Sequence, residues 1–135
     1  MISKTKYFHL KKIKGKRYLN PNLYFGNSGM QAMSNSIIST IHINLIKKIF
    51  NNKLKKICKI YFRVNWNQIK TKKPASSRMG SGKGNLDLYV CNIQKGDVLF
   101  ELNKLPNDII INFYKTLSYK LPFKTRIIYK HNNNI

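Results

Sequence analysis

The sequence predicts one α+β domain in which a largely antiparallel β-sheet packs with two α-helices. Three patterns support this fold: a segment with the apolar period of a helix, a segment with the alternation of a strand, and turn residues between several short apolar runs. A chain of 135 residues that is 42% hydrophobic can bury a single core. We therefore expect residues 1–135 to form a single domain, with a basic arm at 1–17, a protruding glycine-rich loop at 72–85 and a polar tail at 131–135.

The N-terminal region combines cations with turn signals. In the arm, seven Lys and Arg residues are interleaved with aromatic and aliphatic ones, a pattern that fits an edge strand or a segment that orders on binding. Asn20-Pro21-Asn22 predicts a turn, Leu23–Phe25 a short strand, and Gly26–Gly29 a second turn.

Residues 39–55 carry the strongest helical pattern, with Ser39 as the N-cap. One sector of about 100° on the helical wheel is polar and cationic and consists of Thr40, Asn44, Lys47, Lys48, Asn51 and Lys55. The opposite side is apolar and consists of Ile38, Ile41, Leu45 and Ile49, widened by Ile43, Ile46, Phe50 and Leu54. We expect the apolar side to pack on the sheet and the cationic side to lie against phosphates.

Residues 57–64 form the clearest strand. Alternate positions predict a core face, which consists of Cys58, Ile60, Phe62 and Val64. The other face is cationic and aromatic, with Tyr61 between Lys59 and Arg63. Tyr61 can stack on an exposed base, or it can cover the surface of the sheet, and the sequence leaves both alternatives open. Polar residues 65–73 then lead into the glycine-rich loop.

The second half of the chain predicts a hairpin, a helix and a last strand. Leu86–Ile93 and Val98–Leu102 flank the compact turn Gln94–Asp97, which is the pattern of a β-hairpin. Pro106 suits the first position of a second helix, whose apolar side consists of Ile109, Ile110, Phe113 and Leu117. The next proline ends this helix before a last strand at Thr125–Tyr129.

Charge is the most unusual property of the chain: 26 Lys and Arg against four Asp and Glu give a net charge of +22. Residues 1–86 hold 19 Lys and Arg and no acid, whereas residues 87–135 hold seven Lys and Arg and all four acids. Charge of one sign destabilises a compact chain by self-repulsion unless a polyanion neutralises it, so nucleic acid is the expected partner. A membrane-surface protein of this charge would be one continuous amphipathic helix, and several strands argue against it.

No catalytic, metal or cofactor site is predicted. Cys58 and Cys91 lack a CxxC pair and are expected to be small core residues in a reducing compartment, and the three histidines have no metal-ligand spacing with them. The four acids form no evident pair for acid–base catalysis. No apolar run predicts a membrane insertion, and the N-terminus lacks a signal core or an Arg-rich presequence, so the protein is expected to act where it is made.

The loop Arg78-Met79-Gly80-Ser81-Gly82-Lys83-Gly84 follows Lys72-Lys73-Pro74 and is the centre of the functional prediction. Its three glycines allow close approach to another molecule, and its cations favour a phosphate-rich partner. A nucleotide-binding P-loop requires Gly at position 77, Ser or Thr after the lysine, and a helix after the loop. The chain has Ser77, Gly84 and a predicted strand there, so a nucleotide site is excluded.

The same region closely resembles the signature of the L-sixteen family of large-ribosomal-subunit proteins, in its bacterial and organellar form. Arg78–Gly84 matches the highly specific Arg-Met-Gly-x-Gly-Lys-Gly motif of that family. Lys59–Val64 matches the family pattern Lys-Ile-Trp-Ile-Arg-Val, with Tyr in place of Trp. Phe25–Gly29 and Leu121–Thr125 match two further elements, and the resemblance covers roughly residues 8–130.

The resemblance implies a large-subunit protein that binds rRNA, supports tRNA placement near the A and P sites and contacts neighbouring ribosomal proteins. It also implies a protein that is no enzyme and no homo-oligomer. The tRNA-facing tip would consist of Arg78, Met79, Gly80, Ser81, Gly82, Lys83 and Gly84. The rRNA-binding candidates are Lys11, Lys12, Lys14, Lys16, Arg17, Lys47, Lys48, Lys55, Lys59, Arg63, Lys72 and Lys73.

Residue usage bears on the compartment. The chain contains 22 Lys, 18 Ile and 17 Asn but only two Ala, which is what AT-rich codons produce. We therefore expect a mitochondrial ribosome and an organelle-encoded gene, with a relict plastid as the alternative. The alternative function is a free-standing RNA-binding module or an anionic-membrane-binding protein that uses the same charge.

Overall fold

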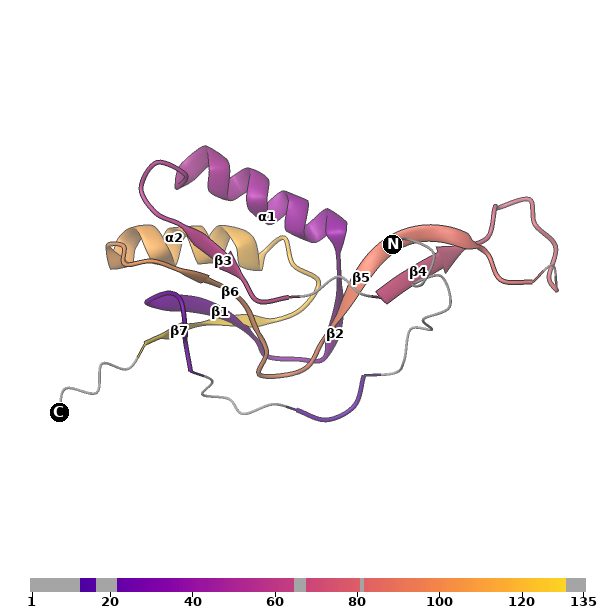
Figure 1. The fold of residues 1–135 in the computed structure, drawn as a ribbon, viewed down its shortest axis with the longest axis horizontal. Helices are drawn as coiled ribbons and strands as arrows, with labels where there is room; N and C mark the ends of the chain where they lie inside the picture. Colours follow the sequence, from indigo (N-terminus) through magenta and orange to yellow (C-terminus); the bar gives the residue numbers. More distant parts are fainter. Residues whose placement is uncertain (1–12, 17–21, 65–67, 81, 131–135) are drawn as a thin grey trace.

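The computed structural model describes residues 13–16, 22–64, 68–80 and 82–130. Within these residues two helices accompany two antiparallel sheets, with strand orders β3-β6-β1-β7 and β2-β5-β4 (Figure 1). The elements are β1 (Ser28–Ala32), β2 (Ser36–Ser39), α1 (Thr40–Lys53), β3 (Ile60–Phe62), β4 (Gln68–Lys72), β5 (Asn85–Ile93), β6 (Val98–Leu102), α2 (Asn107–Ser118) and β7 (Thr125–Tyr129). The predicted α+β class and antiparallel pairing are confirmed, but the strands form two sheets.

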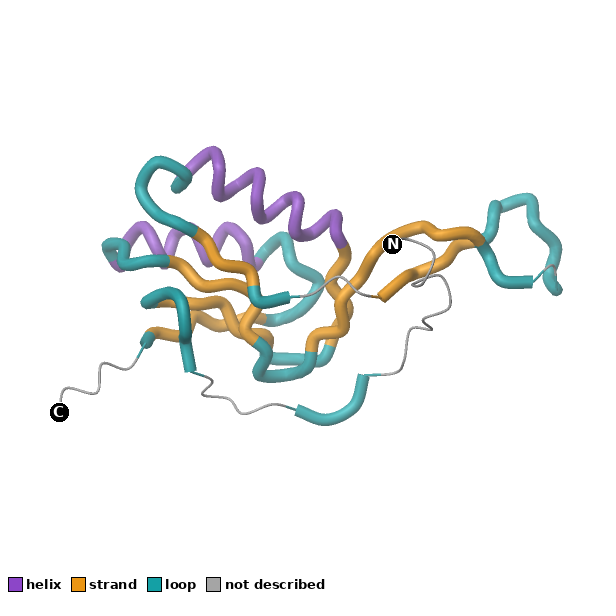
Figure 2. Tube along the Cα trace, in the orientation of Figure 1, coloured by secondary structure: helices purple, strands orange, loops and turns teal. Residues whose placement is uncertain are grey.

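Both helices lie on one face of the four-stranded sheet, and the three-stranded sheet projects away from it (Figures 1 and 2). The core between the helices and the sheet is aromatic. Phe100 of β6 stacks on Tyr114 of α2 with 5.6 Å between ring centroids, and Phe113 of α2 lies 6.3 Å from Phe50 of α1. Burial of each such ring stabilises the fold by roughly 1.5–3 kcal/mol. This core fixes the base from which the second sheet projects.

Helix α1 begins as predicted after Ser39, whose backbone N–H donates to Nδ1 of His42 at 3.3 Å. The cationic sector is exposed, as expected, except for Thr40, which is half-buried. The buried stripe is centred on the residues that were expected only to widen the apolar side, namely Ile43, Ile46 and Phe50. Ile41, which was expected to face the core, is 60% exposed. The helix is rotated in this way because Phe50 packs against α2.

The predicted strand at Leu23–Phe25 is wrong, and β1 begins inside the predicted turn at Gly26–Gly29. The backbone N–H groups of residues 24–26 are bound by the carboxylate of Glu101, so they are satisfied without a neighbouring strand. The strand predicted at 57–64 is shorter than expected. Its predicted core face is confirmed, because its members all pack on the core: Cys58, Ile60, Phe62 and Val64.

The predicted hairpin between β5 and β6 is also wrong. β5 pairs with β2 and β4, whereas β6 pairs with β1 and β3. Residues 94–97 form a corner at which the chain passes from one sheet to the other. This corner is hydrogen-bonded to Ala32 at the end of β1. Ala32 N–H donates to Asp97 O at 2.8 Å, and Gly96 N–H donates to Ala32 O at 2.9 Å. The turn itself was recognised, but β2 and β4, the true partners of β5, were not predicted.

The C-terminal elements follow the prediction closely. Helix α2 buries Ile110, Phe113 and Leu117, although Pro106 is its N-cap instead of its first residue. Strand β7 has the predicted bounds and pairs with β1. Both thiols are half-buried against the core, as expected: Cys58 and Cys91. The polar tail at 131–135 and most of the basic arm lie outside the described residues.

Candidate nucleic-acid interface

The projecting sheet carries the glycine-rich loop at its far end (Figure 1). Strands β4 and β5 pair from Gln68↔Val90 at the base to Lys72↔Asn85 next to the loop. Ile69 and Val90 are buried at the base, whereas residues 74–80 are exposed. The loop is therefore held from both sides by a paired hairpin, which is the rigid base that a contact tip requires.

Glycine is required where the hairpin opens into the loop. A Cβ on Gly84 would lie 2.6 Å from the carbonyl carbon and oxygen of Lys72, so the two backbones approach too closely for any side chain. Gly80 and Gly82 have φ angles of +89° and +81°, in the left-handed region that favours glycine. Met79, beside them, is completely exposed. The expected tight backbone and accessible tip are both present.

The cations of the loop lie before and after the glycines at positions 80 and 82. Arg78 and Lys83 are exposed, as is Lys72 at the end of β4, while Lys73 is half-buried. Ser81 lies outside the described residues. The loop therefore presents a positive, side-chain-poor surface, which suits the phosphates of a polyanion. The roles assigned to these residues from the sequence stay predictions.

A second cationic surface lies along α1 and the segment that follows it. Its members are all exposed: Lys47, Lys48, Lys55 and Lys59. The Nζ atom of Lys47 lies 5.6 Å from the centroid of the Phe62 ring, a cation–π contact that limits the range of this side chain. The helix contains no acidic residue. We define these four lysines as the α1 face.

Four residues of the arm, 13–16, are described and are attached to the corner between the two sheets. The side-chain amide of Asn35 donates to Gly15 O at 3.1 Å, and that of Gln94 donates to Lys14 O at 2.9 Å. The sequence did not predict this attachment, because it joins residues about 20 and 80 positions apart. Among the predicted arm contacts, Lys14 and Lys16 are exposed, while Lys11, Lys12 and Arg17 lie outside the described residues.

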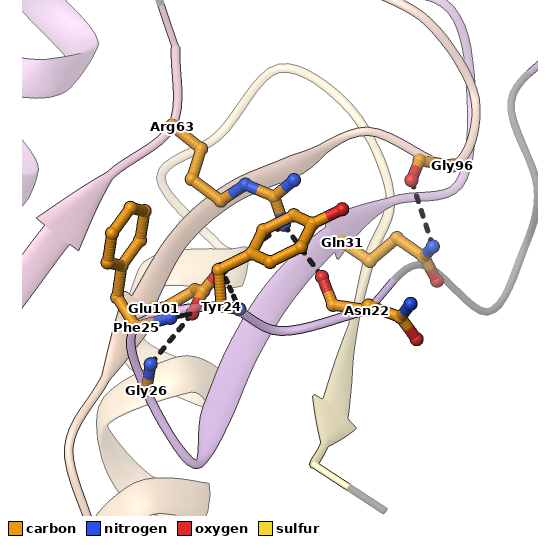
Figure 3. A network of polar contacts seen from close by, with 8 residues as sticks. All are labelled: Asn22, Tyr24, Phe25, Gly26, Gln31, Arg63, Gly96 and Glu101. Atoms are coloured by element: carbon orange, nitrogen blue, oxygen red, sulfur yellow. Dashed lines mark hydrogen bonds and ion pairs between the residues drawn. The ribbon is translucent and has the colours of Figure 1, made fainter.

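Arg63 differs from the other predicted rRNA contacts, because its guanidinium bonds inside the protein (Figure 3). Its Nη1 atom lies 3.1 Å from Oε1 of Glu101 and donates to Asn22 O at 3.2 Å. Glu101 is completely buried, whereas the Arg63 side chain is 24% exposed. The strand pattern showed that Arg63 leaves the core face, but not that a carboxylate 38 residues away would bind it.

Tyr61 contacts another aromatic residue of the protein. Its ring stacks on Phe25 with 5.6 Å between centroids and 28° between planes. This contact favours the alternative in which Tyr61 covers the sheet surface. The exposed rings here are Tyr24 and Phe25, which sequence reasoning assigned to a strand and therefore missed as surface residues. Their position just before a glycine was the one available signal.

The described residues were found to hold neither a metal-binding group nor a membrane-spanning helix. None of their His, Cys, Asp and Glu side chains gather in groups of three that could hold a metal ion. Across the same ranges, neither helix has the length and apolar character needed to cross a membrane.

An α+β fold with a net charge of +22, an exposed cationic helix face and a glycine-rich tip on a projecting hairpin defines a basic nucleic-acid-binding protein. The family model of ribosomal protein L16p/L10e matches residues 2–128. The chain therefore belongs to this family, whose members are structural components of the large ribosomal subunit and not enzymes.

Individual relatives agree with the family match. The chain is 39% identical over 130 residues to large ribosomal subunit protein uL16c of Euglena longa, covering 95% of this chain and 96% of the relative. It is 32% identical over 131 residues to uL16c of Phaeodactylum tricornutum, covering 96% and 95%. It is 36% identical over 110 residues to uL16 of the bacterium Blochmanniella pennsylvanica, covering 82% of each chain. The match thus spans nearly the whole fold.

These relatives confirm the family predicted from the loop motif, and with it association with rRNA and other ribosomal proteins. They also correct the predicted compartment. The expected mitochondrial location is wrong, because the uL16c relatives from Euglena and Phaeodactylum are chloroplast forms and point to a plastid. The AT-rich residue usage that led to the mitochondrial prediction is shared by more than one kind of organelle genome.

Proposed function

We propose that this chain is a constituent of the large subunit of a plastid ribosome, where it binds rRNA through its arm and α1 face and contacts tRNA through the tip at 78–84. The observation that carries the tRNA part is the family motif seated at the end of a projecting hairpin (Figure 1). A single copy acts in each subunit, and the chain performs no chemistry of its own.

The rRNA part of the proposal rests on charge and exposure. The α1 face presents four exposed lysines, and the helix carries no acid. Each of these lysines can therefore attract a phosphate of the RNA backbone. Lys14 and Lys16 add cations beside the corner between the sheets. Lysine is a point charge without the bidentate fork of arginine, so these contacts fix position on the RNA backbone and do not read its sequence.

The tRNA part rests on the shape of the tip. Nothing lies within 4 Å of a Cβ built on Gly80 or Gly82, so a partner can approach the main chain directly. Arg78 offers a planar fork for a phosphate, and Lys83 offers a second positive charge. Because the hairpin holds the tip away from the α1 face, the two surfaces can contact different RNA molecules.

Two experiments test the proposal. A tagged copy expressed in plastid-bearing cells should sediment with the plastid large subunit, and sedimentation apart from that subunit would overturn the assignment. Within assembled subunits, replacing Arg78 and Lys83 with Ala should weaken tRNA binding more than it lowers subunit yield. A matched pair, Lys115→Ala with Lys120→Ala, removes the same charge from α2 and the turn after it and should not affect tRNA binding. Equal loss of assembly and tRNA binding in the loop variant would contradict a tip role.

A further inference from the structure

The loop between the arm and β1 exposes two neighbouring aromatic rings. Tyr24 is 66% exposed and Phe25 is 62% exposed, although aromatic rings are usually covered in a folded chain. Together with the half-buried Tyr61 they form a continuous surface beside the edge strand β3, which we call the aromatic platform. Exposed apolar clusters of this kind commonly mark a contact site.

The three rings are arranged in a regular way. Phe25 stacks on Tyr61, and Tyr24 meets Phe25 edge to face with 6.5 Å between centroids. The guanidinium carbon of Arg63 lies 4.9 Å from the centroid of the Tyr24 ring, so one face of that ring is occupied by a cation (Figure 3). Tyr24 is nevertheless two thirds exposed, so most of this residue remains accessible to a partner.

The platform is held by the backbone. Glu101 accepts the N–H groups of Phe25 at 2.7 Å and of Gly26 at 2.8 Å, and that of Tyr24 at 3.3 Å (Figure 3). These bonds fix the loop through its main chain, while the two rings point away from the core. A surface ordered before binding loses less conformational entropy when a partner arrives. The fold therefore keeps two large apolar rings exposed in one fixed geometry.

We propose that the aromatic platform binds an unpaired nucleobase of RNA, which stacks on the face of Tyr24 opposite Arg63. Stacking on aromatic side chains is the common way in which proteins bind unpaired bases. The contacts of Arg63 with Glu101 and Asn22 both use Nη1, and a guanidinium carries five N–H donors, so donors remain for the phosphate of the same nucleotide. This inference rests on the proposed RNA-binding function and adds a contact made by rings to those made by lysines.

Charge favours RNA over a protein as the occupant. Glu101, the acid of this region, is buried and paired with Arg63, so the platform presents rings and a cation but no exposed carboxylate. Lys59, two residues before Tyr61, adds an exposed cation at the edge of the sheet. A neighbouring ribosomal protein seated on the same rings is the competing outcome, and the second experiment below separates the two.

The first experiment measures binding of the full chain to a single-stranded RNA octamer that contains one 2-aminopurine. The fluorescence of this base falls when it stacks on an aromatic ring. Tyr24→Ala should weaken binding about tenfold, the usual effect of losing one stacked base, and should restore the fluorescence. Tyr24→Phe should bind and quench like the unchanged chain, while Tyr24→Leu, which keeps apolar area without a π face, should behave like Tyr24→Ala.

Tyr119→Ala is the matched control, because Tyr119 is 79% exposed at the end of α2 and outside the platform. If Tyr24→Ala and Tyr119→Ala bind and quench alike, the inference is overturned while the proposed RNA-binding function stands. If the unchanged chain shows no salt-dependent RNA binding at all, the proposed function itself fails. Since the backbone bonds to Glu101 remain in Tyr24→Ala, a matching circular dichroism spectrum is expected for all variants.

The second experiment places a photo-crosslinking phenylalanine at position 24 and irradiates purified large subunits that contain the full chain. A crosslink to rRNA at a nucleotide outside a duplex is the expected result. A crosslink to a neighbouring ribosomal protein, or to a base-paired segment, would overturn the assignment of the platform to an unpaired base.

Discussion

The carboxylate of Glu101 lies 3.1 Å from the guanidinium of Arg63, and this pair joins three segments that are distant in the sequence. Glu101 belongs to β6, Arg63 follows the edge strand β3, and both bind the loop at 22–26. The carboxylate is completely buried and accepts three backbone N–H groups in addition to the guanidinium. Glu101, one of only four acids in the chain, thus organises the surface next to the edge of the sheet.

Glu101→Gln is predicted to destabilise the fold by about 2–4 kcal/mol. A carboxylate can accept from all of its partners, whereas the amide presents two N–H groups to a site that already consists of donors, and Arg63 is left without its counter-charge. The estimate lies below the full cost of breaking a buried pair because Arg63 is partly exposed. Urea unfolding measures the change.

Asp87→Asn is the control for that measurement, because Asp87 is an exposed acid on β5 and its loss changes the net charge equally. Equal midpoints for Glu101→Gln and Asp87→Asn would show that the buried carboxylate has no special structural role. We expect the control to stay within about 0.5 kcal/mol of the unchanged chain, as is usual for surface substitutions.

Local patterns predicted those elements that can be identified from their own residues, without knowing which distant segment they pack against. The periodicity of α2 and the alternation around β3 report which side of each segment is apolar, and burial follows from that. Ser39 marks where α1 begins, although the buried stripe of α1 is rotated from the predicted apolar side. The tip at 78–84 could likewise be predicted, because left-handed glycines and close backbone approach are properties of the segment itself. These features need no knowledge of distant residues.

The errors in the sheets concern pairing between distant segments. The corner at 94–97 has the residues of a hairpin turn, but Ala32 and its neighbours compete for its backbone groups and divide the strands between two sheets. The loop at 23–25 has the residues of a strand, but Glu101 accepts the N–H groups of residues 24–26 from 75 to 77 positions away. No periodicity within a segment reports such a partner, so the aromatic platform was not visible in the sequence.

Gly84→Ala is predicted to open the end of the β4–β5 hairpin at a cost of about 1–3 kcal/mol, the usual range for overpacking. The new Cβ would meet the backbone of Lys72 at 2.6 Å, and a backbone cannot move aside as a flexible side chain can. Hydrogen exchange should show reduced protection for the amides of residues 70–72 and 85–88, while the amides of β6 and α2 remain protected.

Gly82→Asn is the comparison for Gly84→Ala, since nothing lies within 4 Å of a Cβ at position 82 and Asn tolerates a positive φ better than most residues. It should change exchange in the hairpin less than Gly84→Ala does. If Gly84→Ala leaves the hairpin amides as protected as in the unchanged chain, the close approach to Lys72 is not what requires glycine there.

Stability is predicted to fall above about pH 10 through Tyr114. Burial raises the pKa of this phenol well above its ordinary value, against the smaller opposing effect of its hydrogen bond with Ser28 at 3.4 Å. The unfolded chain therefore loses this proton at a lower pH than the folded chain does. The contribution of Tyr114 is fully present below the unfolded pKa and is lost as the pH rises towards the folded pKa, by at most about 1.4 kcal/mol per pH unit.

Tyr114→Phe isolates this effect, because the titration of the lysines cancels between the two chains. On going from pH 7 to pH 11, the unfolding free energy of the unchanged chain should fall by on the order of 1 kcal/mol more than that of the variant. Urea unfolding at both pH values gives the difference. A difference that is the same at pH 7 and pH 11 would contradict the assignment of the alkaline loss to Tyr114.

Neutralising two lysines of the α1 face is predicted to change the salt dependence of rRNA binding. Each lost phosphate contact lowers the slope of log K against log salt by about 0.7–0.9, so Lys47→Gln with Lys48→Gln should lower it by roughly 1.5. Glutamine keeps most of the length of each side chain, so the loss reports charge. Filter binding of the full chain to a large-subunit rRNA fragment, from low to high salt, gives the slope.

The pair Lys115→Gln with Lys120→Gln removes the same two charges from exposed positions on α2 and in the turn after it. If binding depended only on the net charge of +22, both pairs would lower the slope equally. A localised contact by the α1 face requires a larger change for the Lys47 and Lys48 pair, since condensed counterions are released only where a cation lies close to a phosphate. An unchanged slope for that pair would remove the α1 face from the rRNA interface and leave the arm and the hairpin to bind it.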